Sequence, residues 1–202
     1  MKKSFILEAE KIKLLKKKDS VLKNYMDRVG TIERWYEDDF FSALLESMIS
    51  QLVSTKTADT IYQRLLRKVK KLTPENLLNC SDEEIRSCGI SLKKVQNMKV
   101  LAQDIVDQKL NLEELKKASN EEIIEVLTKY SGIGLWTVEM LLIFTLQRED
   151  VISYGDFGIR GGIQKLYGIE KLTKKQFNEI KEKVSPYGSL ASLYYWHAQR
   201  ML

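Results

Sequence analysis

Apolar residues recur at the spacing of one helix face along most of this 202-residue chain. One such stripe consists of Phe41, Leu44, Leu45, Met48, Ile49 and Leu52, and similar stripes follow near residues 58–69 and 95–105. No segment shows the sustained apolar–polar alternation of a half-buried strand. The two prolines, Pro74 and Pro186, follow Thr73 and Ser185, an arrangement typical of helix starts. The sequence therefore predicts an all-α fold.

Capping boxes mark several helix starts, because a Ser or Thr is followed three residues later by Glu or Gln. These pairs are Ser81 with Glu84, Ser119 with Glu122, and Thr173 with Gln176. The first two boxes are each followed by a glycine turn and then a long apolar helix. The first turn contains Gly89 and the second contains Gly132 and Gly134. This similarity predicts an internal helix–turn–helix repeat.

Composition excludes several classes of protein. Apolar residues make up 44% of the chain and charged residues 30%, which is typical of an ordinary globular protein. No apolar run approaches the roughly 20 residues that cross a bilayer. Glu8 and Glu10 interrupt the first residues, which therefore do not resemble a signal peptide. We expect a cytoplasmic protein without membrane contact.

The net charge of +5 is less informative than it first looks. Residues 1–30 contain nine Lys or Arg and four Asp or Glu, while the remaining 24 basic and 24 acidic residues cancel. The run Lys16–Lys17–Lys18 is either a patch that faces phosphate or, more simply, a solvated helix end that favours cations. Charge alone does not identify a nucleic-acid-binding protein here.

Residues that could hold a metal are scarce. The chain has two cysteines, Cys80 and Cys88, and one histidine, His197. Two thiols are too few for an iron–sulfur cluster or a cysteine zinc site. We expect packed free thiols and no cofactor.

The segment around Gly132 and Gly134 predicts a tight turn between two helices. Glycine allows positive φ angles and a close approach of the backbone to a ligand. The N–H groups that open the second helix would then face a phosphate, and the Thr137 hydroxyl could add a contact. The simpler alternative is a helix C-cap in a plain αα-corner.

Asp156 lies about twenty residues after this turn, in Tyr154–Gly155–Asp156. A carboxylate close to an oxocarbenium-like transition state is a strong stabiliser of glycosidic bond cleavage. It could also orient or deprotonate the attacking water. The alternative role is a helix N-cap before Phe157, and the two roles can coexist.

Several motifs together resemble one family. The sequence Ser131–Gly132–Ile133–Gly134–Leu135–Trp136–Thr137 resembles the helix-hairpin-helix motif of the helix-hairpin-helix–Gly/Pro–Asp DNA glycosylases, in particular the bacterial 3-methyladenine DNA glycosylase II branch. Residues 50–58, 89–94, 185–191 and 195–196 are similar to other parts of that branch, in order. The resemblance extends from about residue 30 to the C-terminus.

This resemblance implies a set of DNA contacts. It places phosphate-binding amides at Gly132 and Gly134, with a monovalent cation often held by the hairpin carbonyls. Ser131, Thr137 and Gln51 complete the expected DNA-binding residues. Ser131 stands where the family often has proline, which should loosen the turn slightly.

The resemblance also implies the catalytic site. Asp156 takes the place of the catalytic aspartate, while Trp136 and Trp196 line the base pocket. Tyr154 could also stack on a flipped base, and Met140 stands where a relative has a pocket tyrosine. For the two tryptophans, plain core packing is the alternative. Bifunctional relatives have an attacking lysine at the position of Trp136, so strand cleavage is not expected.

The sequence thus predicts a monofunctional glycosylase of base excision repair that removes alkylated purines of the 3-methyladenine type from double-stranded DNA. Two alternatives remain: a glycosylase for deaminated or oxidised bases, and a non-catalytic DNA-binding module. We expect two helical subdomains around a DNA-binding cleft. Residues 1–40 would pack with 153–202, and 41–152 would form the central subdomain, with the helix-hairpin-helix at about 120–147. The expected location is the bacterial cytoplasm or nucleoid, without an obligate protein partner.

Overall fold

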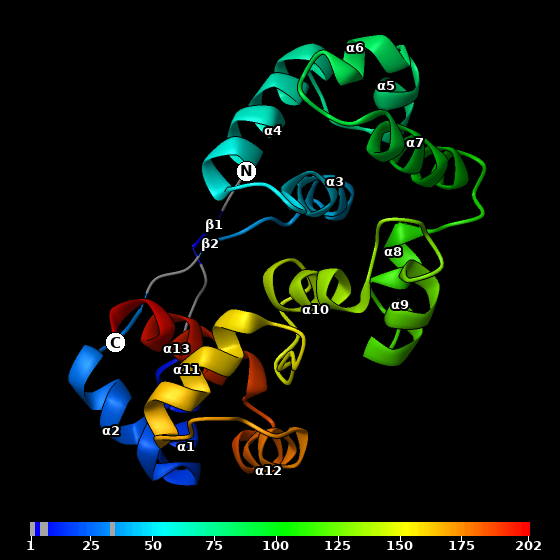
Figure 1. Cartoon of the computed structure of the whole chain (residues 1–202). Helices are drawn as coiled ribbons and strands as arrows, with labels where there is room; N and C mark the ends of the chain where they lie inside the picture. Colours follow the sequence, from blue (N-terminus) through cyan, green and yellow to red (C-terminus); the bar gives the residue numbers. More distant parts are fainter. Residues whose placement is uncertain (1–2, 5–7, 33–34) are drawn as a thin grey trace. The chain divides into compact units, whose positions relative to one another are not determined.

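The computed structural model describes residues 3–4, 8–32 and 35–202 (Figure 1). Its elements are, in chain order, β1 (Lys3–Ser4), α1 (Ala9–Lys18), α2 (Ser20–Val29), β2 (Trp35–Tyr36), α3 (Phe40–Ser50), α4 (Thr55–Val69), α5 (Pro74–Leu78), α6 (Asp82–Arg86), α7 (Leu92–Val106), α8 (Leu112–Leu115), α9 (Asn120–Leu127), α10 (Leu135–Phe144), α11 (Phe157–Tyr167), α12 (Lys174–Val184) and α13 (Gly188–Met201).

The all-α prediction is confirmed. The described strands form a single antiparallel pair of two residues each, in which Lys3 pairs with Tyr36 and Ser4 with Trp35. All other described regular structure is helical. Within the described residues, no helix is long and apolar enough to span a membrane.

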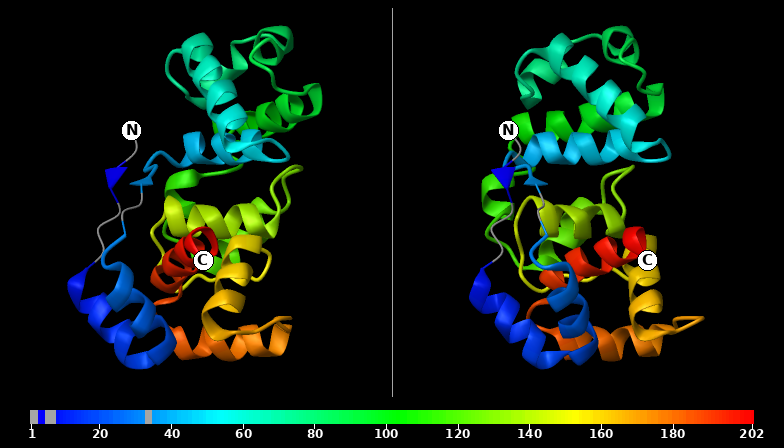
Figure 2. Two further views of the ribbon diagram at one scale, coloured as in Figure 1. Left: turned by 60° about the vertical axis from the view of Figure 1, so that its left-hand side comes forward. Right: turned by 90° about the vertical axis from the view of Figure 1, so that its left-hand side faces the viewer.

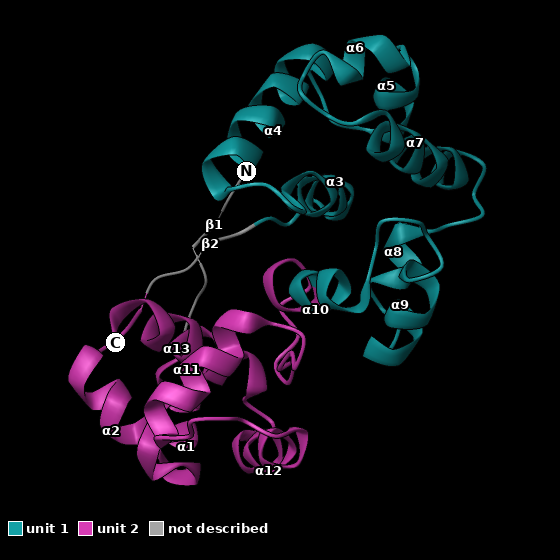
Figure 3. Ribbon diagram, viewed as in Figure 1, with its two compact units in different colours: residues 1, 37–141 teal, residues 2–36, 142–202 magenta. Residues whose placement is uncertain are grey.

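The described residues divide into two compact units (Figure 3). The first unit consists of residues 37–141, and the second combines the N-terminal segment up to Tyr36 with residues 142–202. The boundaries between the units therefore lie at 36/37 and 141/142. The second boundary falls inside α10. The boundaries expected from the sequence are 40/41 and 152/153.

The first unit is organised around α3 and α7. Helix α3 packs against α4 and α7, and α7 also contacts α5 and α6. Their contact faces bury Leu45, Leu65, Met98 and Leu101 almost completely. The predicted capping boxes at Ser81 and Ser119 are present, as is the one at Thr173 in the second unit.

In the second unit, α11 and α13 lie side by side (Figures 1 and 2). Their approach depends on Gly162, because a Cβ atom there would collide with the backbone carbonyl of Tyr195. Ile159 and Ile163 on α11 and Tyr194 on α13 belong to the buried core of this unit. The close α11–α13 contact matters for the site, because these helices carry Asp156 and Trp196.

Asp19 is a fully buried carboxylate in the second unit. It caps α2 by accepting a hydrogen bond of 2.8 Å from the Leu22 N–H, and it accepts a second bond of 2.7 Å from the Tyr167 hydroxyl. The Lys183 ammonium lies 2.9 Å from Oδ2, the same oxygen that accepts the Tyr167 hydroxyl, while the Leu22 N–H binds Oδ1. Burial acts to raise the pKa of Asp19, but these three donors outweigh it and hold the pKa below its ordinary value.

We expect Asp19→Asn to destabilise the protein by about 1–3 kcal/mol at pH 7, since it removes charge-assisted hydrogen bonds in a buried place. A lowered folded-state pKa gives stability that is present above the unfolded-state value of about 4 and is lost as the pH falls. The difference between wild type and variant, measured by urea unfolding, should therefore shrink below about pH 4. Asp59→Asn, which changes an exposed carboxylate of α4, is the control. A difference that stays constant from pH 7 to pH 3 would contradict this explanation.

Candidate nucleic-acid interface and carboxylate site

The predicted hairpin is present between α9 and α10. The turn contains Gly132 with φ +88°, a conformation that other residues rarely adopt. Ile133 is buried beneath the turn, whereas Ser131, Gly132 and Gly134 are exposed. Gly134 accepts the N–H of Val138, so that the N–H groups of the first turn of α10 lie beside the exposed glycines. An anion at this place would meet several backbone donors.

Gln51 connects this turn to the end of α3. Its Nε2 atom donates a hydrogen bond of 2.7 Å to the Gly132 carbonyl and lies 3.3 Å from the Thr137 Oγ1 atom. The Gln51 carbonyl in turn accepts a bond of 2.8 Å from Lys94 Nζ, which also binds the carbonyl of Ile49. Burial lowers the pKa of Lys94. Lys94 thus satisfies carbonyl groups at the C-terminal end of α3.

The Thr137 hydroxyl was predicted to contact a phosphate, but it is buried. Its side chain is 3% exposed and its hydroxyl faces Gln51, so it does not present that hydroxyl at the surface. Its backbone N–H, by contrast, belongs to the first turn of α10. The hydroxyl therefore supports the hairpin, and only the backbone of this residue is placed for a ligand.

The hairpin carbonyls are also the expected ligands of a monovalent cation. One lone pair of the Gly132 oxygen is taken by Gln51. A carbonyl oxygen has two lone pairs, so this bond leaves one for a cation. The cation site stays a prediction. Among the described residues, no three His, Cys, Asp or Glu side chains gather as a metal site.

The prediction that Leu52 belongs to the apolar stripe of α3 is wrong. Helix α3 ends at Ser50, and the Leu52 side chain beyond it is fully exposed. Its φ angle of +61° is unusual for a bulky residue. Ser54 caps α4, and this cap was the available signal, because it leaves Leu52 in the turn between two helices. Val53 beside it is also exposed.

Asp156 is the N-cap of α11, as predicted, and is 7% exposed. Its Oδ1 atom accepts a hydrogen bond of 2.8 Å from the Ile159 N–H and another of 2.8 Å from the Trp196 indole N–H. Two donors on one oxygen fix the rotamer of this carboxylate. Trp196 is itself half-buried, with its ring 5.3 Å from that of Phe144.

Gly158 makes the indole contact possible. A Cβ atom at this position would lie 2.6 Å from Trp196 Cδ1 and 3.0 Å from Nε1, closer than real side chains approach. Sequence reasoning gave no role to Gly158, because the tryptophan that needs the space is far away in the chain. The next residue before it, Phe157, is a largely exposed aromatic side chain that the sequence analysis also left without a role.

Tyr154 has partners other than Asp156. Its ring packs edge-on against Phe177, with centroids 5.0 Å apart, and the Arg160 guanidinium lies 5.4 Å from its centre. These contacts occupy the ring inside the second unit. The structure thus brings Trp196 to Asp156, whereas the recorded contacts of Tyr154 are with Phe177 and Arg160.

Trp136 and Met140 lie four residues apart on α10 and therefore share a helix face. Trp136 is 41% exposed, which excludes the plain core-packing alternative for this residue. Met140 is half-buried. An exposed indole beside a thioether forms a surface on which an aromatic ligand can stack.

Known proteins share this arrangement of elements. The sequence model of the HhH-GPD superfamily base excision DNA repair proteins matches residues 45–186. DNA-3-methyladenine glycosylase 1 of Schizosaccharomyces pombe is 34% identical over 166 residues, which cover 80% of this chain and 73% of the relative. The DNA-3-methyladenine glycosylase of Saccharomyces cerevisiae is 32% identical, over 71% of this chain and 52% of the relative.

Two solved structures are also similar. A DNA-3-methyladenine glycosidase from Bacillus halodurans superposes with a TM-score of 0.88 at 32% identity, over 98% of this chain and 93% of the other. The S. pombe 3-methyladenine DNA glycosylase in complex with abasic DNA gives a TM-score of 0.80 at 30% identity, over 96% and 98% of the two chains.

The contact between Trp196 and Asp156 can be tested directly. Gly158→Ala places a methyl group against the indole, so we expect loss of the hydrogen bond to Asp156. In ¹H–¹⁵N spectra the Trp196 indole proton should move upfield and exchange faster with solvent. Gly134→Ala is the matched control, since a Cβ there meets nothing within 4 Å. An unchanged Trp196 indole signal in Gly158→Ala would contradict this contact.

Proposed function

Because the chain belongs to the HhH-GPD superfamily of base excision DNA repair proteins, we propose that it is a DNA glycosylase for alkylated purines of the 3-methyladenine type. It hydrolyses the N-glycosidic bond of a damaged base in double-stranded DNA. The observation that carries the proposal is the Asp156 carboxylate, which is largely buried and held by two N–H donors on one oxygen.

Asp156 has the properties that this reaction requires. Cleavage of the bond between a purine and deoxyribose develops positive charge on the sugar, and a fixed carboxylate stabilises that charge without reorganising. The cap of α11 and the indole of Trp196 hold the carboxylate in one orientation. We therefore assign Trp196 the positioning of Asp156, in addition to its predicted place beside the base.

The substrate class follows from charge and aromatic surface. An N-alkylated purine is a cation and already a good leaving group, so one carboxylate suffices. The indole of Trp136, which is 41% exposed, would attract such a cation by about 0.5–2 kcal/mol, and Met140 lies on the same helix face. Tyr154 contributes less in this proposal, because Phe177 and Arg160 occupy its ring.

The hairpin holds the DNA strand in this proposal. The backbone N–H groups around Gly134 and Thr137 bind a phosphate, Ser131 lies at the exposed tip, and Gln51 keeps the turn in place. Trp136 occupies the position of the attacking lysine of bifunctional relatives, and an indole cannot form a Schiff base. We propose base removal without strand cleavage, by a monomer acting in the bacterial cytoplasm or nucleoid.

Leu52 fits the gap that a flipped base leaves behind. Enzymes that act on a base inside a duplex extrude it, and apolar side chains inserted between bases stabilise the distorted DNA. Leu52 is fully exposed in a positive-φ conformation, which is costly and typical of functional sites. Its neighbour Gln51 is fixed on both sides by Lys94 and Gly132. We propose that Leu52 fills the gap.

The catalytic role is tested by Asp156→Asn. Asparagine still caps a helix, but it cannot stabilise the oxocarbenium charge, so excision should fall by about 10²–10³-fold or more. Binding to an abasic-site duplex should persist. The measurement is single-turnover release of free base from DNA that carries methylated, deaminated or oxidised purines, one lesion at a time.

Asp39→Asn is the matched control, because Asp39 caps α3 in the same way. Unchanged excision by Asp156→Asn would contradict the mechanism and favour a non-catalytic DNA-binding module. Release of deaminated or oxidised bases alone would contradict the proposed substrate class.

The role of Leu52 is tested by Leu52→Ala. Its loss removes roughly 1.5–3 kcal/mol of apolar burial in the distorted duplex, so excision from duplex DNA should fall about tenfold or more. Excision from single-stranded DNA, which has no gap to fill, should stay the same. Val100→Ala, another exposed apolar side chain, is the control. An equal loss on both substrates would exclude this role.

A further inference from the structure

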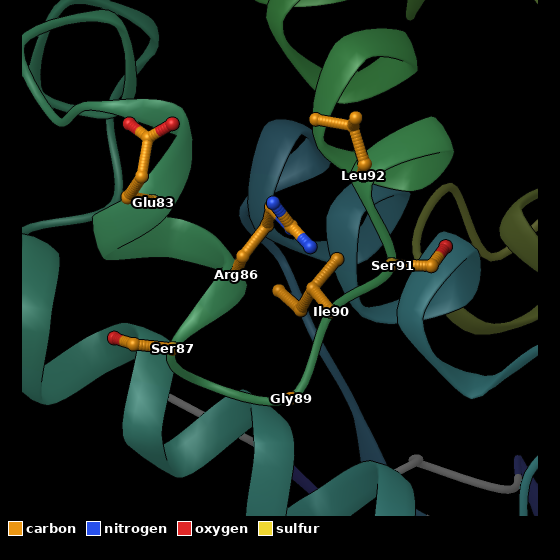
Figure 4. A pocket seen from close by; sticks show the side chains of 7 residues that line it. All are labelled: Glu83, Arg86, Ser87, Gly89, Ile90, Ser91 and Leu92. Atoms are coloured by element: carbon orange, nitrogen blue, oxygen red, sulfur yellow. The ribbon is translucent and has the colours of Figure 1, made fainter.

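Three open hollows of the first unit adjoin one another around the Gly89 turn. The first is lined by Glu83, Arg86, Ser87, Gly89, Ile90, Ser91 and Leu92 (Figure 4). The second adds Arg64, Arg67, Lys68 and Cys88, and the third adds Lys56, Thr57, Thr60 and Ile61. Each hollow shares a lining residue with the other two, namely Ser87, Gly89 or Arg64. They form one continuous surface along α4 and α6.

Lys and Arg side chains gather on this surface. We call it the basic surface and define it by its five cationic residues, Lys56, Arg64, Arg67, Lys68 and Arg86. Within the described part of the chain, none of these five side chains makes an ion pair or a hydrogen bond. Glu83 is the single carboxylate that lines these three hollows.

Four other lysines of the same unit, by contrast, form ion pairs. Lys99 lies 2.6 Å from Asp82, Lys109 2.9 Å from Asp107, and Lys129 3.1 Å from Glu125. The thiol at the floor of the second hollow is no substitute for a carboxylate. Burial raises the pKa of Cys88, against the smaller opposing effect of Lys68 and Arg64, so it stays neutral. The basic surface therefore carries five cations against one carboxylate, Glu83.

The chemistry of the lining indicates the ligand. Besides the cations, the hollows present the hydroxyl side chains of Thr57, Thr60, Ser87 and Ser91. Arg, Lys, Ser and Thr are the side chains that contact DNA phosphates. Protein interfaces instead centre on buried aromatic anchors, and no aromatic side chain lines these three hollows.

The turn at Gly89 has the same order of local elements as the hairpin at Gly132. In both, a capping box opens a short helix and a glycine with positive φ precedes a longer helix, with Gly89 at +102° and Gly132 at +88°. A Cβ at Gly89 would press on Ile61 of α4, at 3.3 Å. The predicted internal repeat thus exists as local structure, and its first copy lies at the centre of the basic surface.

We propose that the basic surface binds the sugar–phosphate backbone of duplex DNA flanking the lesion, as a second contact distinct from the hairpin. This inference rests on the proposed function. Helix α4 begins directly after the turn that carries Leu52, so the surface continues from the proposed gap-filling residue. Lys56 and Arg67 are separated by about 16 Å along α4, a length of duplex axis that contains about five phosphates of each strand.

The test is the salt dependence of DNA binding by the triple variant Arg64→Gln, Arg67→Gln and Arg86→Gln. Each lost phosphate contact should lower the slope of log K against log salt by about 0.9. We expect a slope shallower by about 2 to 3 and a dissociation constant raised about tenfold or more, equally for undamaged and abasic duplexes. Fluorescence anisotropy with a labelled duplex of about 20 base pairs measures both quantities.

The control triple variant is Lys117→Gln, Lys174→Gln and Lys175→Gln. It makes the same change in net charge at exposed lysines outside the three hollows. A salt slope equal to that of the control would overturn the proposal. So would loss of binding to an acidic peptide such as oligoglutamate with unchanged DNA binding, which would assign the surface to a protein partner.

Activity separates this inference from the proposed function. At enzyme concentrations that saturate the DNA, base release by the triple arginine variant of the basic surface should equal that of wild type, because Asp156 is untouched. If wild type released no base, the proposed function would fail, while the binding assay on undamaged duplex would still decide the role of the basic surface.

Discussion

The hydrogen bond from the Trp196 indole to Asp156 joins the proposed chemistry to the fold. The same oxygen caps α11 through Ile159. Because one bond comes from α13 and the other starts α11, the carboxylate is oriented by the contact between these two helices. That contact depends on missing side chains, at Gly162 for the helix approach and at Gly158 for the indole. Substitutions that separate α11 from α13 therefore affect stability and the proposed catalytic group together.

The hairpin has a comparable support in the first unit. Gln51 ends α3, and its side chain holds the Gly132 carbonyl while its backbone carbonyl is held by Lys94. These bonds fix the residue directly before Leu52 to the turn proposed to bind phosphate. A rigid attachment matters for a side chain that must enter a base stack, since a mobile one would lose more conformational entropy on insertion.

Local sequence patterns predicted much of this structure, but they did not predict contacts between residues that are far apart in the chain. The helices, the three capping boxes and the cap at Asp156 follow from residues within four positions of each other. The bond from Gln51 to Gly132 joins residues 81 positions apart, and that from Trp196 to Asp156 spans 40. Periodicity alone assigned Leu52 to a buried stripe, because its spacing continues that of α3 after the helix has ended. The burial of the Thr137 hydroxyl has the same origin, since only the fold brings Gln51 to it.

The number of charged residues in the sequence does not show how charge is distributed on the surface of the folded protein. After residue 30 the basic and acidic residues are equal in number, so their count indicates no charged surface. The fold distributes them unevenly. Carboxylates near α7, α8 and α9 lie beside lysines of the same region, as in the pair of Lys116 with Glu113. The cations of α4 and α6 keep their charge exposed around Gly89. A polyanion responds to this local field, which falls off within about 10 Å at 0.1 M salt, and not to the net charge of the chain.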